Sequence, residues 1–425
     1  MSSQTARYVV VSADSHVGPK MLEQLRPYCP QQYLDEYDAW LAEVEAEKRN
    51  ATGRGFVSKL PERTSEVRRK IGEEKGAWDI QARLARMDED GVAAEVMYHG
   101  TGAERIPFNR PQLVDIATNP SLAGPELEAV GVRMYNQWVA DSVSMAPDRL
   151  IGLAQMPLAS SLDVWVTEAE WAKAAGLRGI NLPAPKVGQH QYFEPYWETL
   201  WAACEDLEMS LNTHSGSGDI LLFDAPPEYH YMFKQFETGY FGRRHVHQMV
   251  LSGVFERHPG LYLAVTEQAG HWVEGIIRDM ESSYFQRWAS DLRKDVKKRP
   301  REVWATNCFV GASMMADTEA RLALEPEGKR LNLMWGRDYP HLEGTWPYTK
   351  ECMRKTFGGL PPEVIRPLIG GNAIRLYGLD VNNLQDVADK IGPTVEDLAE
   401  SLPADQIPSD DEYQGFGFRT IGQWG

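Results

Sequence analysis

Two potential metal ligands follow the first strand-like stretch of the chain. Residues 7–13 read Arg-Tyr-Val-Val-Val-Ser-Ala and lead directly into Asp14 and His16. Because side chains alternate across a strand, a spacing of two directs both toward the same face. A carboxylate and an imidazole presented together are ligands for a divalent metal ion. An isolated Asp-x-His pair also arises in acidic turns, so the other ligands must come from elsewhere in the chain.

The elements that would position this pair alternate regularly along the sequence. From Trp78 onward, apolar strand-like stretches alternate with helical stretches. The opening strand and seven later ones make eight, each followed by helical sequence, which predicts an α/β fold of the (β/α)8 TIM-barrel class. A doubly wound open sheet is the alternative, but its glycine-rich phosphate fingerprint is missing after the first strand. The later strands are predicted over residues 91–98, 150–156, 177–182, 209–214, 261–267, 305–310 and 331–338.

Two segments fall outside the barrel pattern. Residues 17–78 predict a helical insertion after the first strand, with charged helices over 31–49 and 60–75. Residues 1–380 are therefore expected to form one metal-dependent barrel domain. The C-terminal extension, residues 381–425, turns acidic and rich in Pro, Gly and aromatic residues. Its aromatic side chains favour packing on a partner subunit, so we expect a homodimer.

Charge and cysteine usage argue against several classes of protein. The formal net charge is −17 and the pI is near 5.1, which argues against a nucleic-acid partner. No apolar run is long enough to cross a bilayer and no secretory leader is recognisable, so we expect a cytoplasmic protein without a membrane partner. None of the 4 cysteines falls in a Cys-x-x-Cys pair, which indicates neither a disulfide framework nor a thiolate zinc site.

Further ligand-type residues stand where the predicted strands end. In a TIM barrel the catalytic groups lie at the barrel mouth, the face formed by the carboxyl ends of the strands. The fifth predicted strand ends at His214, the sixth at Glu267 and the eighth at Asp338. Together with Asp14 and His16, these residues predict a metal site at the barrel mouth.

This pattern resembles the amidohydrolase superfamily, in the branch that contains aminocarboxymuconate-semialdehyde decarboxylase and related metal-dependent hydrolases. The resemblance spans most of residues 7–378 and implies a TIM barrel with metal ligands at Asp14, His16, His214 and Asp338. It rests on Ser-Ala-Asp-Ser-His at 12–16, Leu-Asn-Thr-His-Ser-Gly at 211–216, Gly-Val-Phe-Glu-Arg-His-Pro at 253–259, Trp-Gly-Arg-Asp-Tyr-Pro-His at 335–341 and Gly-Asn-Ala at 371–373.

Two departures from the usual ligands of the family make this site rich in carboxylate. Asp14 stands first in the opening pair, and Glu267 stands where many relatives have His. Carboxylates favour harder ions such as iron or manganese. His271 follows Glu267 by four residues and would supply another nitrogen if a helix starts there. The extended set is large enough for two metals and consists of Asp14, His16, His214, Glu267, His271 and Asp338.

The acid-rich site leaves competing functions open. The preferred hypothesis is a non-haem diiron monooxygenase that uses two Fe ions and O2 to hydroxylate an apolar acyl substrate linked to coenzyme A, because a subset of the resembling family is similarly acid-rich. Its catalytic residues would be Glu267, His271 and Asp338. The alternative is a mononuclear Zn or Mn enzyme that hydrolyses or non-oxidatively decarboxylates a small carboxylic substrate, with Glu267 or His271 as the general acid or base. A non-catalytic barrel is the least favoured hypothesis.

The remaining histidines and one basic cluster have separate interpretations. His99, at the end of the second predicted strand, and His341, just after Asp338, are expected to contact substrate. His245 and His247 imitate a ligand pair, but residues two apart on a helix do not share a face. A basic cluster could hold coenzyme A phosphates, although mixed-charge helices are usually solvated faces. It consists of Arg63, Arg68, Arg69 and Lys70.

Overall fold

The structure is a computed structural model in which a parallel sheet closes into a barrel. It describes residues 6–54, 73–101, 105–108, 124–184, 189–215, 227–341, 343–408 and 416–419. The basic cluster and most of the helix predicted over 60–75 lie outside the described residues. The strands are β1 (Val11–Ser12), β2 (His16–Val17), β3 (Ala94–His99), β4 (Leu150–Ala154), β5 (Gly179–Asn181), β6 (Ser210–His214), β7 (Leu263–Thr266), β8 (Cys308–Ser313) and β9 (Leu333–Gly336).

The strand order closes the sheet into a TIM barrel. Neighbours follow the order β1-β3-β4-β5-β6-β7-β8-β9, and β2 continues the first strand position by pairing with β3. Closure comes from the residues that follow β1, which bond to β9 and to the loop after it: the Ala13 amide donates to the Trp335 carbonyl at 2.9 Å, and the Asp338 amide donates to the Asp14 carbonyl at 3.0 Å. With β1 and β2 counted as one strand, the predicted (β/α)8 fold is confirmed.

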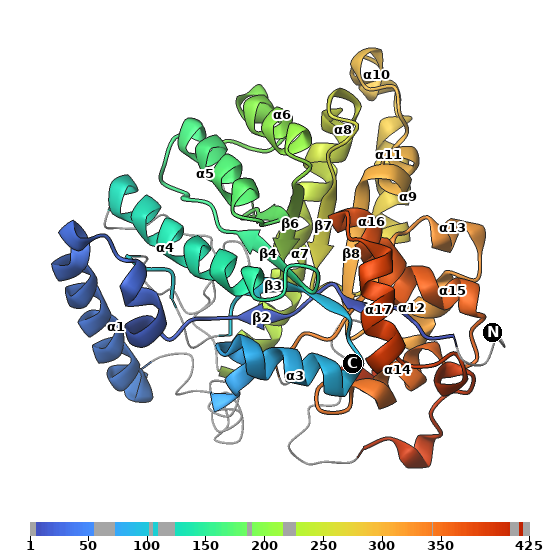
Figure 1. Ribbon diagram of the computed structural model, residues 1–425. Coiled ribbons are helices and arrows are strands. Elements are labelled where there is room, and N and C mark those ends of the chain that lie inside the picture. Colours follow the sequence, from blue (N-terminus) through green and yellow to red (C-terminus); the bar gives the residue numbers. More distant parts are fainter. Residues whose placement is uncertain are drawn as a thin grey trace.

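Helices surround the barrel, and α1 lies at the outer edge of the molecule (Figure 1). Because helices cover the sheet from outside and side chains fill it from inside, every residue of each strand is buried. The helices are α1 (Leu34–Arg54), α3 (Ile80–Asp90), α4 (Pro125–Ser144), α5 (Leu162–Ala174), α6 (Glu198–Asp206), α7 (Pro227–Leu251), α8 (Val254–Arg257), α9 (Val273–Tyr284), α10 (Leu292–Asp295), α11 (Pro300–Asn307), α12 (Asp317–Leu322), α13 (Pro326–Lys329), α14 (Thr349–Phe357), α15 (Pro362–Arg366), α16 (Asn372–Tyr377) and α17 (Val381–Ile391).

Local sequence signals set the ends of α3, which leads into β3. The Asp79 side chain accepts hydrogen bonds from the amides of Gln81 and Ala82, a cap that typically stabilises a helix by about 1 kcal/mol. Gly91 ends the helix with a φ of 76°, a left-handed conformation that glycine adopts at little cost. These two signals fix the turn from which β3 enters the barrel.

The opening strand is shorter than predicted. Its upstream residues pair with the C-terminal extension instead: Arg7 forms an antiparallel bridge with Thr394, and the Tyr8 amide donates to the Pro393 carbonyl at 2.9 Å. In the strand-like sequence, Arg7 and Tyr8 therefore pair with the C-terminal extension, and only Val11–Ser12 forms a strand of the barrel.

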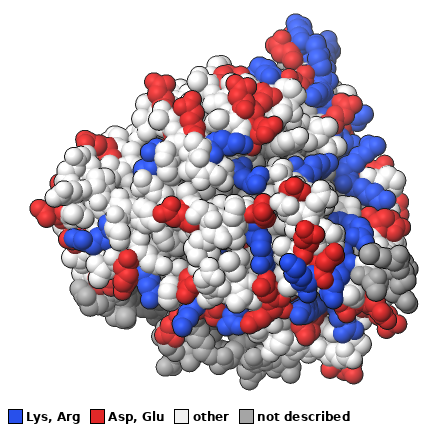
Figure 2. Space-filling model, in the orientation of Figure 1, with Lys and Arg blue, Asp and Glu red and all other residues white. Residues whose placement is uncertain are grey.

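The described parts of the C-terminal extension pack on the barrel of the same chain. Leu384 and Ala388 of α17 are buried, and Phe418 packs with Cys352 and Leu402. The domain division at residue 380 and the homodimer stay predictions. No helix among the described residues is long and apolar enough to cross a bilayer. Figure 2 shows acidic and basic side chains on the same face, with basic ones gathered around α10.

Candidate metal centre

Three predicted ligands meet at the first and fifth strand positions of the barrel. Asp14 lies between β1 and β2, His16 begins β2, and His214 ends β6. The Oδ1 atom of Asp14 lies 3.3 Å from His214 Nε2 and 3.6 Å from His16 Nε2. All three side chains are buried, and one ligand atom from each lies within 4.8 Å of the others. The structure thus brings together the opening pair and a histidine far away in sequence.

The eighth strand position brings Asp338 to the same centre. Its Oδ1 atom lies 3.2 Å from His16 Nε2 and 3.0 Å from His341 Nδ1. The rings of His16 and His341 stack with their centroids 4.0 Å apart. Asp338 therefore stands between a buried histidine of the first strand and a histidine of its own loop.

Glu267 and a residue that sequence reasoning missed extend the cluster outward. Glu267 Oε2 lies 3.3 Å from His214 Nδ1. Glu267, Asp338, His341 and Glu343 form a further group whose ligand atoms lie within 4.8 Å of one another. Glu343 follows His341 by two residues, and this spacing was the available sequence signal for it. Whether the Glu343 side chain reaches the cluster depends on the path of the loop. Four acidic and imidazole side chains thus line the outer side of the centre.

Backbone carbonyls orient two of the imidazoles. His16 Nδ1 lies 3.1 Å from the His99 carbonyl, and His214 Nδ1 lies 2.8 Å from the Ser215 carbonyl. Because a carbonyl oxygen only accepts, each Nδ1 is the nitrogen that carries the proton. The Nε2 atoms of His16 and His214 face the carboxylates and are the nitrogens available to a metal ion.

A hydroxyl and two unusual backbone conformations position the carboxylates. The Ser313 hydroxyl at the end of β8 donates to Asp14 Oδ2, a contact that the sequence analysis did not anticipate. Glu267 and Asp338 both have a φ of 52°. A non-glycine residue in this left-handed region costs of order 1–3 kcal/mol and persists only where its surroundings hold it. Glu267 directly follows β7 and Asp338 comes two residues after the end of β9, so the strain falls at the barrel mouth.

Burial and close contact shift the pKa values of the carboxyl and imidazole groups in this cluster. Burial, reinforced by neighbouring carboxylates, raises the pKa of Glu267 to about 8 and that of Asp338 to about 7. Burial opposes protonation of His214, but Asp14 and Glu267 outweigh it and raise its pKa to about 9. Burial and the neighbouring imidazoles lower the pKa of His16 well below its ordinary value. A divalent cation would relieve this competition for protons.

Two buried polar atoms fit a cation directly. His16 Nε2 and Asp338 Oδ2 are buried and make no hydrogen bond to any described residue. A buried polar atom without a partner costs about 1–3 kcal/mol, and more when it is charged. Metal coordination would satisfy both atoms at once, so the residues present fit a bound metal ion.

Other predicted site residues lie apart from these groups. His271 is 48% exposed, and its Nδ1 atom lies 3.6 Å from Glu319 Oε1. The buried His99 ring packs edge-on against Tyr135, with the centroids 5.1 Å apart. His245 Nε2 lies 2.7 Å from the Pro183 carbonyl, on the outer side of the barrel wall. The structure therefore does not gather the six-residue set envisaged for two metals.

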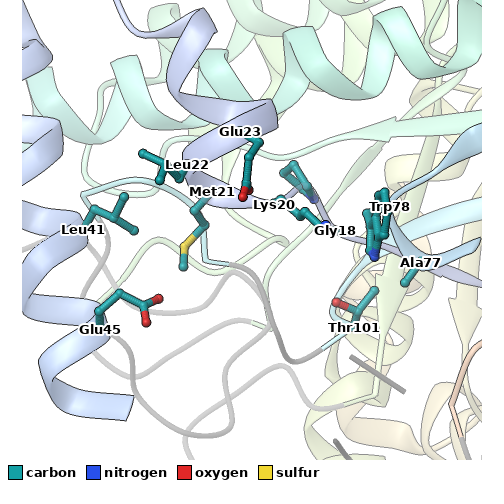
Figure 3. A pocket seen from close by; sticks show the side chains of 11 residues that line it. Gly18, Lys20, Met21, Leu22, Glu23, Leu41, Glu45, Ala77, Trp78 and Thr101 are labelled. Atoms are coloured by element: carbon teal, nitrogen blue, oxygen red, sulfur yellow. The ribbon is translucent and has the colours of Figure 1, made fainter. Parts of the chain in front are cut away.

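A cavity of about 340 Å³ opens beside the first strand position. Its walls include Gly18, which follows β2, and Thr101, which follows β3. Figure 3 shows that α1 and the segment around Trp78 provide the opposite walls. The Lys20 ammonium lies 3.8 Å from the centroid of the Trp78 ring. The cavity is of the size that takes small molecules.

Comparisons with known proteins match most of the chain. A family model described as amidohydrolase matches residues 111–379. The γ-resorcylate decarboxylase of Rhodococcus jostii (strain RHA1) is 26% identical over 287 residues, which cover 62% of this chain and 78% of that protein. The resemblance inferred from the motifs is therefore confirmed.

Solved structures show the same fold at low sequence identity. Metarhizium anisopliae IDCase in its apo form aligns with a TM-score of 0.59 at 16% identity, over 87% of this chain and 97% of that chain. The dihydroxybenzoic acid decarboxylase of Polaromonas sp. JS666, with bound manganese and the inhibitor 2-nitroresorcinol, aligns with a TM-score of 0.55 at 16% identity, over 89% and 99% of the two chains.

These similarities contradict the preferred hypothesis of a diiron monooxygenase and the classification as an oxidoreductase. The relatives are decarboxylases, the reaction class of the alternative, and one contains manganese. The excess of carboxylate was misleading because Asp14 and Glu267 both face His214, while His271 stands outside the cluster. Metal binding and a small-molecule substrate are supported, whereas nothing supports two irons, dioxygen or an acyl-CoA.

Proposed function

Because the chain belongs to the amidohydrolase family, we propose that it is a metal-dependent, non-oxidative decarboxylase of a small hydroxy-substituted aromatic acid. The observation that carries the proposal is the convergence of buried ligand atoms in two groups that share His16, one with Asp14 and His214 and the other with Asp338 and His341, with His16 Nε2 and Asp338 Oδ2 lacking hydrogen bonds to described residues. The chemical class of the substrate comes from the names of the similar proteins.

One divalent cation, Mn²⁺ or Zn²⁺, would be held by Asp14, His16, His214 and Asp338. Carboxylate oxygens and imidazole nitrogens are ligands for both ions. When bound, the cation would supply a positive charge against which the anionic oxygens of the substrate are held. Asp14 is fixed by the Ser313 hydroxyl, and the two histidines are fixed by backbone carbonyls, so these ligands are oriented before a metal arrives.

Decarboxylation needs a proton donor beside the metal ligands. The bond between the ring carbon and the carboxyl carbon breaks, the electron pair stays on the ring carbon, CO2 leaves, and the ring carbon takes up a proton. We assign this proton to a carboxyl oxygen of Glu267. Its side chain touches His214 but remains 11% exposed, whereas Asp14 and Asp338 are completely enclosed. Glu267 therefore reaches both the centre and the open side from which water can restore its proton.

His341 is the side chain we propose to orient the substrate. It stacks on His16 and contacts Asp338, yet its side chain is 16% exposed. Its Nε2 atom lies 2.9 Å from the Gly100 carbonyl, which fixes the ring plane. A planar aromatic acid that enters the barrel mouth would meet a flat, preoriented imidazole there.

The proposal is tested by following the product in heavy water. Protein loaded with Mn²⁺ is incubated under argon with a panel of dihydroxybenzoates in ²H2O, and the products are identified by NMR. We expect CO2 and a phenol that carries one deuterium at the carbon that lost its carboxyl group. A hydroxylated product, or no turnover of any hydroxybenzoate by metal-loaded protein, would contradict the proposal.

Two variants extend this experiment to the ligand set. Asp338→Asn is expected to lose bound metal and turnover together, because it removes the charge of a carboxylate at the centre. His271→Gln is the control and is expected to keep its metal, because His271 is half exposed and outside the ligand groups. Metal content is measured by elemental analysis after gel filtration.

A further inference from the structure

The last described residues of the chain end in a buried ion pair beside the barrel mouth. Arg419 donates from Nη2 to Glu319 Oε2, and the two side chains are only 1% and 3% exposed. Next to it, Phe418 packs with Cys352 of α14 and with Leu402. The C-terminal end is therefore anchored by an apolar contact and a buried charge pair, both on the barrel of the same chain.

Glu319 connects this ion pair to the loop after β7. Its Oε1 atom accepts hydrogen bonds from the Gly270 amide at 2.5 Å and the His271 amide at 3.3 Å. Its Oε2 atom accepts from the Ala316 amide at 2.8 Å as well as from Arg419. One carboxylate of α12 thus joins the C-terminal end of the chain to the loop that begins with Glu267.

That loop is held at its start, at its end and at Gln268, whose amide donates to the Gly311 carbonyl at 3.2 Å. At its start, the Ser215 hydroxyl donates to the Glu267 carbonyl at 2.7 Å. At its end, Gly270 is bound by Glu319 and packed so closely that a Cβ there would lie 2.9 Å from the Leu333 side chain. The left-handed backbone at Glu267 lies between these points and needs its neighbours to hold it.

We propose that Arg419 is a positioning residue for Glu267: it holds Glu319 against the amides of Gly270 and His271, and the loop they belong to places the Glu267 carboxyl at the barrel mouth. A buried carboxylate without a cationic partner is drawn toward solvent. Loss of Arg419 would therefore loosen the loop and move the proton donor away from the substrate. This inference rests on the proposed function, in which Glu267 delivers the proton.

If the Arg419 contact only stabilised the fold, its substitution would have a different effect. Loss of a contact that only stabilises the fold lowers the thermal midpoint but leaves the kcat and KM of the folded enzyme unchanged. Loss of a positioning contact lowers kcat while KM stays nearly constant, because substrate binding does not depend on the proton donor. The metal ligands Asp14, His16, His214 and Asp338 do not contact Glu319 or Arg419 in any described interaction, so metal affinity should be preserved.

The test compares Arg419→Gln with Arg419→Lys in the full-length, Mn²⁺-loaded protein. We expect Arg419→Gln to lower kcat by about 10- to 100-fold, the usual effect of removing a supporting contact, with KM and the Mn²⁺ dissociation constant within about twofold of wild type. Arg419→Lys restores the positive charge and should recover most of the lost rate. Arg133→Gln is the matched control, because it breaks the ion pair with Glu168 between α4 and α5 and should leave kcat unchanged.

Amide hydrogen exchange provides a readout independent of catalysis. The amides of Gly270 and His271 should lose protection in Arg419→Gln and keep it in Arg419→Lys, even if the wild type turns over no hydroxybenzoate. Unchanged protection in Arg419→Gln would overturn the inference and leave the proposed function standing. A lower thermal midpoint with unchanged kcat, or a parallel loss of Mn²⁺ affinity, would also overturn it.

Discussion

At the residue scale, the centre depends on side chains that hold the ligands as much as on the ligands themselves. The two Asp14 oxygens have separate partners: Oδ1 faces His214 and His16, whereas Oδ2 accepts from the Ser313 hydroxyl. With Oδ2 occupied, Oδ1 is the oxygen that points toward the imidazoles. The Ser313 hydroxyl thus decides which oxygen of Asp14 is offered to a metal.

Ser313→Ala should weaken metal binding without unfolding the protein. Removing the hydroxyl leaves Asp14 free to rotate, and such supporting contacts are typically worth about 10- to 100-fold in metal affinity. The Mn²⁺ dissociation constant is measured by titration calorimetry. Ser252→Ala, which removes a hydroxyl that bonds only within its own helix end, is the control. Equal affinities for wild type and Ser313→Ala would show that Asp14 is oriented by other contacts.

The sequence predicted the residues at strand ends and missed those that reach the centre from loops. Asp14, His16, His214 and Asp338 follow from barrel geometry, because the carboxyl ends of parallel strands share one face. Glu343 was missed because its contacts depend on the path of its loop, and Ser313 was missed because β8 continues to Ser313, beyond the strand predicted over 305–310. His271 was grouped with Glu267 by spacing, but the left-handed turn and the Glu319 contact direct it elsewhere.

At the element scale, a buried charge network binds α3, β3 and the loop after β9. Glu95 of β3 accepts from Arg83 of α3 and, at 2.9 Å, from Arg337 Nε. Arg337 also contacts Asp90 at 2.6 Å, and Arg83 donates to the His16 carbonyl at 2.8 Å. The elements that carry His16 and Asp338 are therefore fastened to each other by paired charges inside the protein.

Glu95→Gln should be strongly destabilising. The change removes the carboxylate partner of Arg83 and leaves Arg337 with Asp90 alone, and breaking such a buried pair typically costs about 3–5 kcal/mol. The free energy of unfolding is measured with urea. Asp38→Asn breaks the exposed pair with Arg26 and is the control, since solvent already screens that pair. Similar midpoints for the two variants would mean that the buried network contributes no more than a surface contact.

Acid should destabilise the protein partly through His245 of α7. Burial lowers the pKa of His245 to about 4 in the folded chain. Its ordinary pKa is near 6.5, so between these values only the unfolded chain takes up the proton. The contribution of neutral His245 is complete above pH 6.5 and is lost as the pH falls toward 4. The difference between 6.5 and about 4 corresponds to roughly 3 kcal/mol.

This effect is measured with metal-free protein by urea unfolding between pH 4 and 7. His245→Gln keeps a donor for the Pro183 carbonyl but does not titrate, so its stability should fall less steeply with acid than that of wild type. Tyr192→Phe keeps the ring that stacks on His245 and removes the hydroxyl that donates to the Pro183 carbonyl, so His245 still titrates and the stability of this variant should keep its dependence on pH. Parallel curves for wild type and His245→Gln would refute the assignment to His245.

The sequence predicted whole elements better than their ends. The helical stretch expected between the second and third predicted strands is α4 (Pro125–Ser144), because Pro at its start and a long apolar face favour a helix there. The strand predicted over 305–310 begins later, at Cys308, because α11 (Pro300–Asn307) runs directly into it. The shortened opening strand reflects pairing of Arg7 and Tyr8 with the C-terminal extension, which local sequence does not reveal.

At the scale of the whole molecule, barrel and family were predictable, whereas metal number and reaction were not. Strand alternation and ligand-type residues at strand ends follow from the sequence alone. The choice between one metal and two depends on which carboxylates pair with which imidazoles, and that is a matter of three-dimensional distances. The reaction depends further on the substrate, so the carboxylate count pointed to oxygen chemistry that the decarboxylase relatives contradict.

The central claim is that one divalent metal at the barrel mouth supports decarboxylation without dioxygen. It is tested most directly by titrating metal-free protein with Mn²⁺ under argon and measuring CO2 release from a hydroxybenzoate that the metal-loaded enzyme decarboxylates. We predict no release without metal and a linear rise that stops at one Mn²⁺ per chain. Release that is independent of metal, that requires dioxygen, or that continues to rise up to two metals per chain would contradict this account.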